Sequence, residues 1–152
     1  MTPAVERVVE ANTLLLGLGF ESGGLAAVHS IHNGLTALEG THDYGHGEEV
    51  SFGTISMLML EERPAELVEE VVDFCLEVGL LAALEDIGIG EASREDLEKV
   101  AEAARVEGKT IHNEPFDVYP EMVVDAMLAA DAFGRQRRTV LEGEARLPAV
   151  AQ

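Results

Sequence analysis

Histidine is the residue whose number and spacing in this sequence first suggest chemistry. Four of the five histidines, His29, His32, His42 and His46, fall within one Gly-rich stretch of 18 residues. Neutral imidazole offers a lone pair near neutral pH, so histidine is the commonest metal ligand among side chains. A catalytic zinc ion uses three protein ligands and one open position. Spacing alone leaves two candidate pairs, His29 with His32 and His42 with His46, and the local sequence nominates no third ligand.

Other residue patterns have simpler structural interpretations. A histidine on a helix is more often hydrogen-bonded in the core or at the surface than bound to a metal. The single cysteine, Cys75, lies on an apolar helical face in VVDFCLEVG, which indicates a buried thiol and excludes an internal disulfide or a cysteine-based zinc cluster. The segment GLGFESGG is no dinucleotide loop, because it follows a predicted helix and has one residue too many.

Composition and charge restrict the class of protein and its partners. The chain has 152 residues, of which 47% are hydrophobic, so it can form one domain with a substantial core. Its formal net charge of −19 repels nucleic acid and anionic membranes, and neither is an expected partner. No apolar run reaches 18 residues and no signal-peptide pattern opens the chain. We therefore expect a cytoplasmic protein.

The elements that carry the histidines are predicted to be helices. Thr2 and Pro3 form a typical helix start, and apolar residues at helical spacing continue to Leu16. GLGFESGG is then predicted to be a turn, with a second helix from Gly24 to about Leu38 that places His29 and His32 on one face. The loop THDYGHG carries the other two histidines, and a helix that is apolar nearly all round is predicted over residues 48–60.

The remaining chain continues the helical pattern. Helices are predicted after Pro64, from Ser93 to Gly108 and over residues 121–133, with the loop TIHNEPF between the last two. No stretch alternates apolar and polar residues as a half-buried strand does. We therefore predict an all-α fold with one helical metal- and substrate-binding domain over residues 1–138 and a flexible tail over residues 139–152.

Beyond these patterns, the sequence resembles a known family. GFESGGLAAVHSIHNGLTALEGTHDYGHGEEVSFGT is similar to the core of the helical C-terminal domain of glycerol dehydrogenases, which belong to the iron-containing (group III) alcohol dehydrogenase superfamily. FCLEVGLLAALEDIGI, TIHNEPF and ADAFGR match the same family in the same order, up to Arg138. The resemblance implies a dehydroquinate synthase-like C-terminal domain.

The resemblance also implies an activity and assigns residues to it. It implies an NAD-dependent dehydrogenase that uses one Zn2+ and oxidises a small polyol, glycerol, to dihydroxyacetone. The family's histidine metal ligands match His29 and His46, and an aromatic residue of its substrate pocket matches Phe20. His32 and His42 would then have supporting or structural roles, and His112 of TIHNEPF would anchor its loop.

One large part of the family pattern is absent from this sequence. Family members begin with a Rossmann-like NAD-binding domain, and the aspartate that is their third zinc ligand lies ahead of the position that matches residue 1 here. We therefore expect a separately encoded N-terminal half as partner, a homo-oligomer once the enzyme is complete, and no turnover by this chain alone. The alternative expectation is a non-catalytic helical module or a decayed fragment of the same family.

Overall fold

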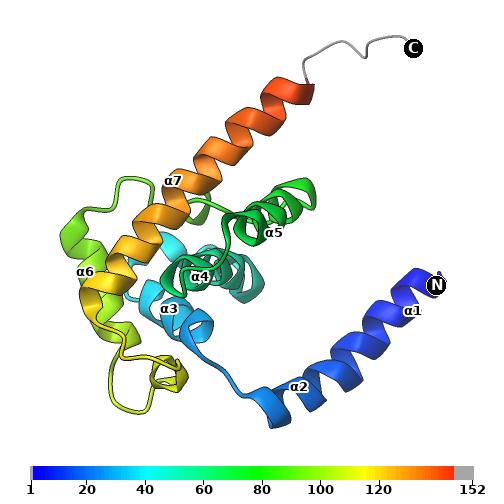
Figure 1. Cartoon of the computed structure of the whole chain (residues 1–152), viewed down its shortest axis with the longest axis horizontal. Helices are drawn as coiled ribbons and strands as arrows, with labels where there is room; N and C mark the ends of the chain where they lie inside the picture. Colours follow the sequence, from blue (N-terminus) through cyan, green and yellow to red (C-terminus); the bar gives the residue numbers. More distant parts are fainter. Residues whose placement is uncertain (1, 146–152) are drawn as a thin grey trace.

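The computed structural model describes residues 2–145, and helices are the only regular elements in that range, which confirms the predicted all-α fold. In chain order the elements are α1 (Pro3–Glu10), the π-helical η1 (Ala11–Leu15), α2 (Leu16–Gly23), α3 (Ala27–Leu35), η2 (Glu39–Thr41), α4 (His46–Leu60), α5 (Ala65–Glu77), η3 (Leu84–Ile87), α6 (Arg94–Ala104), η4 (Thr110–Asn113) and α7 (Pro120–Ala145). Helices α3 to α7 pack into one body (Figure 1).

Helix α4 lies at the centre of this body, as its continuous apolar pattern predicts. It packs against α3, α5 and α7, and Phe52 and Ile55 are fully buried. Ile31 of α3, Val100 of α6 and Met127 of α7 complete the core around it. Because a helix surrounded on several sides has no solvated face, its sequence shows no polar stripe.

Glycines bring α3 very close to its neighbours. A Cβ atom built on Gly53 of α4 would lie 3.0 Å from the carbonyl oxygen of Val28, and one built on Gly34 of α3 would overlap the carbonyl oxygen of Val100. Only a residue without a side chain fits at such a close approach of two backbones. These contacts fix the position of α3, which carries two of the candidate histidines.

Residues Pro3–Gly23, which we call the arm, form one nearly continuous helix that projects from the body (Figure 1). The turn predicted over GLGFESGG is therefore wrong: α2 continues to Gly23, and the chain turns only at Gly24, where φ is +70°. Glycine weakens a helix by about 1 kcal/mol relative to alanine but does not by itself end one. No single helix in the described part is long and apolar enough to cross a membrane. The arm and α3 reach that length and hydrophobicity only when they are counted together, and the chain bends by 102° between them.

Helix α7 extends further than its apolar pattern predicts. It continues past residue 133 to Ala145, so the first half of the predicted tail is helical, and residues 146–152 lie outside the described residues. Arg137 makes two hydrogen bonds to the Asp73 carboxylate of α5, at 2.8 and 2.6 Å, and Arg138 pairs with Glu85 at 3.1 Å. Ion pairs therefore hold this part of α7 against the body. Charged residues do not contribute to a hydrophobic period, so the sequence pattern did not predict this part of the helix.

Candidate metal and substrate site

Three of the four clustered histidines come together where α3 passes the start of α4. His29 and His32 are three residues apart on one face of α3, and His46 is the first residue of α4. The ring centroids of His29 and His46 are 5.6 Å apart, and those of His32 and His46 are 4.4 Å apart. His42 does not join them, because its Nε2 donates to the carbonyl oxygen of Thr36 at 3.0 Å.

A hydrogen-bonded chain runs from a buried carboxylate to His46. The Nδ1 of His32 donates to Oε2 of Glu49 at 2.8 Å, and the Glu49 side chain is only 5% exposed. Since Nδ1 carries the proton of neutral His32, its Nε2 accepts a hydrogen bond from Nδ1 of His46, at 2.9 Å. This arrangement leaves the Nε2 lone pair of His46 free. We call these three residues the relay.

The surroundings of His29 favour the neutral form that a metal requires. Partial burial lowers the pKa of His29 below its usual value, and the neighbouring His46 and His32 lower it further. Neutral imidazole has a lone pair available for coordination near pH 7.

The two imidazoles fit a shared divalent ion in chemistry and spacing. Two histidine nitrogens that bind one zinc ion tetrahedrally at about 2.0–2.1 Å place their ring centroids about 5 Å apart, close to the separation of His29 and His46. Within residues 2–145, no group of three or more His, Cys, Asp or Glu side chains is arranged to hold an ion. The described chain therefore offers two donors, and a complete zinc site needs a third from elsewhere.

The loop after α6 holds the first turn of α3 in place. The buried Glu114 accepts a hydrogen bond from the Ala27 amide at 2.8 Å, where Ala26 offers no side-chain cap. Asn113 donates to the carbonyl oxygen of Leu25 at 2.7 Å. Burial raises the pKa of Glu114, and Glu61 raises it further, against the Ala27 hydrogen bond. Because His29 lies in the turn that Glu114 caps, these contacts fix its position.

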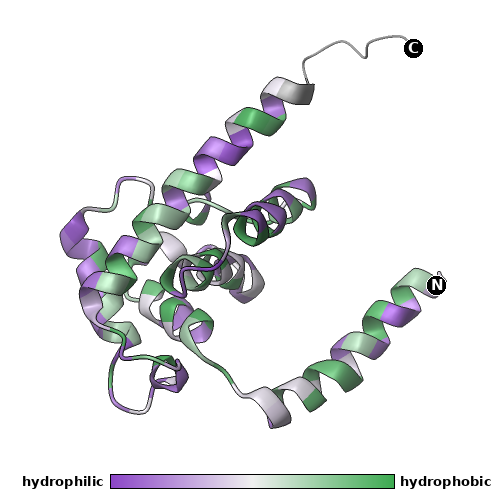
Figure 2. Cartoon of the chain, viewed as in Figure 1, coloured by the Kyte–Doolittle hydropathy of each residue, from purple (hydrophilic) through white to green (hydrophobic). Residues whose placement is uncertain are grey.

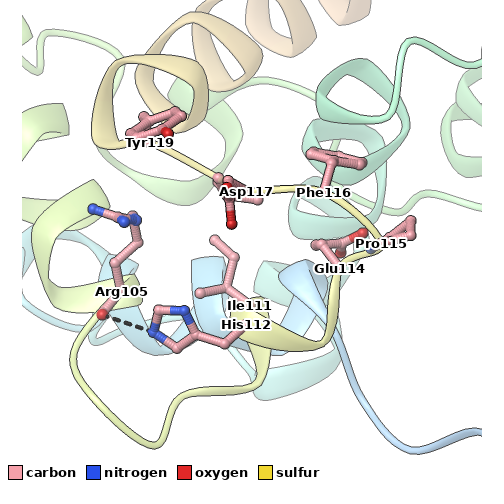
Figure 3. Close-up of a pocket in the computed structure, with 9 residues that line it drawn as sticks. Arg105, Ile111, His112, Glu114, Pro115, Phe116, Asp117 and Tyr119 are labelled. Atoms are coloured by element: carbon pink, nitrogen blue, oxygen red, sulfur yellow. Dashed lines mark hydrogen bonds between the residues drawn. The ribbon is translucent and has the colours of Figure 1, made fainter.

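A hollow of about 580 Å³ lies on the outer side of the same loop, lined by residues that include Arg105, Asp117 and Tyr119 (Figure 3). His112 also lines it, and its Nε2 donates to the carbonyl oxygen of Arg105 at 3.0 Å. His112 therefore ties the loop to the end of α6 and does not join the cluster of His29, His32 and His46.

A second hollow places Phe20 beside the candidate metal ligands. It has a volume of about 660 Å³ and lies between the arm and the start of α3. Phe20 and Leu16 line it from the arm, and Leu25 and His29 line it from the other side. Phe20, which the family resemblance assigns to the substrate pocket, thus shares a hollow with His29.

Two carboxylates at this site were not predicted from the sequence. Glu49 follows His46 by three residues in HGEE, a spacing that places both on one face of α4. Glu114 lies in TIHNEPF, where nothing local marks it as a helix cap. The chain contains 29 acidic residues, so residue type alone does not show that Glu49 and Glu114 are the ones buried at this site.

Comparisons with known proteins show the family to which this chain belongs, the glycerol dehydrogenases. A glycerol dehydrogenase of Thermotoga maritima is 56% identical over 140 residues, which are 92% of this chain and 38% of that protein. A glycolaldehyde reductase of Halobacterium salinarum is also 56% identical, over 91% of this chain and 38% of its own length. No protein-family model matches the chain.

Solved structures give the same result. The crystal structure of glycerol dehydrogenase from Schizosaccharomyces pombe has a TM-score of 0.90 and 40% identity, and covers 93% of this chain and 37% of its own. The crystal structure of a probable glycerol dehydrogenase from Sinorhizobium meliloti has a TM-score of 0.85 and 49% identity. The match covers 90% of this chain and 39% of that protein. The chain therefore spans less than two-fifths of the length of these relatives, and the match corresponds to their helical C-terminal part.

Proposed function

Because this chain is homologous to the C-terminal helical part of the glycerol dehydrogenases, we propose that it is the metal- and substrate-binding part of an NAD- and zinc-dependent enzyme that oxidises glycerol to dihydroxyacetone. The observation that carries this proposal is the placement of His29 and His46, whose ring centroids lie 5.6 Å apart beside the hollow that Phe20 lines. A Rossmann-like part outside residues 2–145 would bind NAD, and a residue outside that range would supply the third metal ligand.

The side chains of the site have distinct tasks in this proposal. His29 and His46 would hold Zn2+, which as a Lewis acid lowers the pKa of a substrate hydroxyl when bound. Oxidation of an alcohol to a carbonyl releases a proton and a hydride, and NAD+, held by the part of the enzyme outside residues 2–145, would supply the hydride acceptor. Phe20 forms an apolar wall of the hollow, which keeps water from the hydride path. The relay keeps the Nε2 lone pair of His46 available.

The relatives also support a second candidate activity. The glycolaldehyde reductase of H. salinarum is as similar to this chain as the glycerol dehydrogenase of T. maritima. Reduction of glycolaldehyde is therefore the second candidate activity. Both substrates are small and carry two oxygens on adjacent carbons, a pattern that one divalent ion can bind.

A hybrid enzyme tests this proposal. The N-terminal part of the T. maritima enzyme, up to the start of the matched region, is joined to this chain, and glycerol-dependent reduction of NAD+ and glycolaldehyde-dependent oxidation of NADH are measured. We expect zinc-dependent activity in the hybrid and none in the chain alone. His29→Ala or His46→Ala should reduce kcat/KM by about 10³-fold, since each removes a ligand of the Lewis acid.

His42→Ala is the matched control, because His42 lies in the same stretch but bonds only the Thr36 carbonyl oxygen. It should leave kcat/KM within about twofold of the unsubstituted hybrid. A folded, zinc-loaded hybrid without either activity would instead favour a non-catalytic helical module. Full activity in the His29→Ala hybrid would contradict the assigned ligand.

A further inference from the structure

Arg105, at the end of α6, is a cation that the rest of the described chain leaves without a carboxylate partner. Within residues 24–145 every other arginine forms an ion pair with Asp or Glu; these are Arg63, Arg94, Arg135, Arg137 and Arg138. The Nε atom of Arg105 is buried and has no hydrogen-bond partner in the described part of the chain. A buried N–H group without a partner costs free energy, although 29 acidic residues were available to supply one. The guanidinium group is therefore open to a ligand.

The hollow of about 580 Å³ outside the loop after α6 gives such a ligand a place to bind. Its volume lies within the range of about 300–1,000 Å³ that is typical of small-molecule pockets. Arg105 and Asp117 both line it, and Figure 3 shows their charged groups on opposite sides of the hollow. Asp117 is exposed and forms no ion pair with another residue of the described range. The hollow thus presents one unpaired positive group and one unpaired negative group.

The other polar groups of the hollow are already engaged or carry no charge. Glu114 accepts the Ala27 hydrogen bond on the inner side of the loop, and burial raises its pKa. His112 donates from Nε2 to the carbonyl oxygen of Arg105. Both hydrophilic and hydrophobic residues occur along this loop (Figure 2), and its Tyr119 adds an aromatic ring that can stabilise an ammonium group packed against its face.

We propose that this hollow binds a small zwitterion, a molecule of the amino acid class, whose carboxylate pairs with Arg105 and whose ammonium group pairs with Asp117. The planar guanidinium group matches a carboxylate with two parallel N–H···O hydrogen bonds. Overall charge favours a zwitterion over a simple anion. The net charge of −19 repels a ligand that is negative overall, whereas a zwitterion carries no net charge. This inference does not depend on the proposed function.

A ligand in this hollow would also stabilise the loop that holds the first turn of α3. Glu114 and Asn113 contact Ala27 and Leu25 from the inner side of the same loop. A ligand that binds only the folded chain raises its Tm. We therefore expect the bound zwitterion to raise the Tm of the isolated chain.

An NMR titration of the isolated chain tests the proposal with defined probes. Glycine, β-alanine and γ-aminobutyrate are zwitterions in which the two charges lie progressively further apart. Acetate and ethylammonium, used at the same ionic strength, each carry one of these charges alone. At least one zwitterion should shift the amides of residues 104–119 saturably, with a Kd at least about tenfold below those of acetate and ethylammonium, because it forms a second charged pair.

Two outcomes of this titration would overturn the proposal. If no zwitterion shifts these amides saturably, the hollow holds water only. If acetate binds as tightly as the best zwitterion, the hollow is an unselective anion site and Asp117 has no part in binding.

Substitutions show whether Arg105 and Asp117 form the two contacts. Arg105→Gln or Asp117→Asn should raise the Kd of the best zwitterion at least about tenfold, since each removes one charged pair. Asp117→Asn should not weaken acetate binding, because acetate pairs with Arg105 alone. Asp117 is exposed and unpaired within the described range, so Asp117→Asn keeps the test valid if Arg105→Gln does not fold.

Arg94→Gln is the matched control. Arg94 lies at the start of the same helix and pairs with Asp125 at 3.1 Å, outside the hollow, so this variant removes the same charge elsewhere. Its Kd for the best zwitterion should stay within about twofold of the unsubstituted value, because solvent and salt screen a distant exposed charge. Unchanged binding in Arg105→Gln or in Asp117→Asn would overturn the proposal.

Discussion

The relay determines which nitrogen of His46 carries a proton. Glu49 fixes the proton of His32 on Nδ1, and His32 in turn accepts from Nδ1 of His46. Outer hydrogen-bond partners of this kind orient a metal-ligating histidine and raise its basicity. Glu49 and His32 are therefore positioning residues, and His46 is the residue that would touch the ion.

Removing His32 should weaken metal binding without removing a ligand. In the hybrid enzyme, His32→Leu should raise the Kd for zinc by about 10–100-fold, because the His46 ring loses its acceptor. His32→Gln, which can still accept from His46, should restore part of the affinity. Nitrogen NMR of the zinc-free chain should show the proton of His46 on Nδ1; a proton on Nε2 would contradict the relay. His42→Leu serves as the control.

Glu114 gives the stability of the chain a dependence on pH. Burial raises its pKa above 4.5, so its contribution to stability is full below the unfolded pKa and is lost as pH rises through the folded value. Glu114→Gln keeps an acceptor for the Ala27 amide but cannot ionise. Relative to the unsubstituted chain, this variant should therefore gain stability as the pH rises above 4.5, measured by urea titrations. A relative loss over that range would contradict the assigned burial.

The residues of the site could be predicted only in part from the sequence. Spacing showed that His29 and His32 share a helix face, but the pairing of His29 with His46 came from family resemblance, because a loop lies between them. The structure shows the physical reason that spacing could not supply: Gly53 lets α4 approach α3 closely. Glu49 was missed because its burial depends on that same contact.

At the scale of helices, Gly34 in the body lies at a close backbone contact, whereas Gly19 in the arm has open space around it. Gly34→Ala should destabilise the isolated chain by about 1–3 kcal/mol, because its Cβ would overlap the carbonyl oxygen of Val100. Gly19→Ala, whose Cβ meets nothing, should leave the stability of the body unchanged and raise the helicity of the arm. Urea denaturation and circular dichroism measure the two effects.

Gly143→Ala provides a control for Gly19→Ala, because Gly143 is also helical and its Cβ meets nothing within 4 Å. Both alanines should raise the helicity of the isolated chain by a similar amount, because neither Cβ atom meets another group. A loss of helicity in Gly19→Ala alone would contradict the open position assigned to Gly19.

Element boundaries were the least predictable part of the fold. Gly17 and Gly19 indicated a turn, yet the helix continues to Gly23. The chain turns at Gly24, which is the first glycine of the described sequence with a positive φ. The extension of α7 depends on ion pairs such as Arg137 with Asp73, which join residues 64 positions apart. A local hydrophobic period shows neither which glycine adopts a positive φ nor which charged residues pair across a long stretch of sequence.

At the scale of the whole molecule, the chain combines a well-packed body with an exposed helical arm. The all-α architecture follows from the sequence because nearly every apolar stretch has helical spacing. The site cannot be completed in the same way: the described residues supply two imidazoles, one aromatic wall and an unpartnered arm. Under the proposed function, residues outside the range 2–145 would complete the metal site.

X-ray absorption at the zinc edge of the hybrid enzyme tests the central claim most directly, because it counts the imidazole ligands of the ion. The account predicts two imidazole ligands with Zn–N distances of about 2.0–2.1 Å. It predicts one in His29→Ala or His46→Ala, and none when both are replaced. Two imidazole ligands retained in the double variant would show that zinc binds elsewhere and would contradict the account.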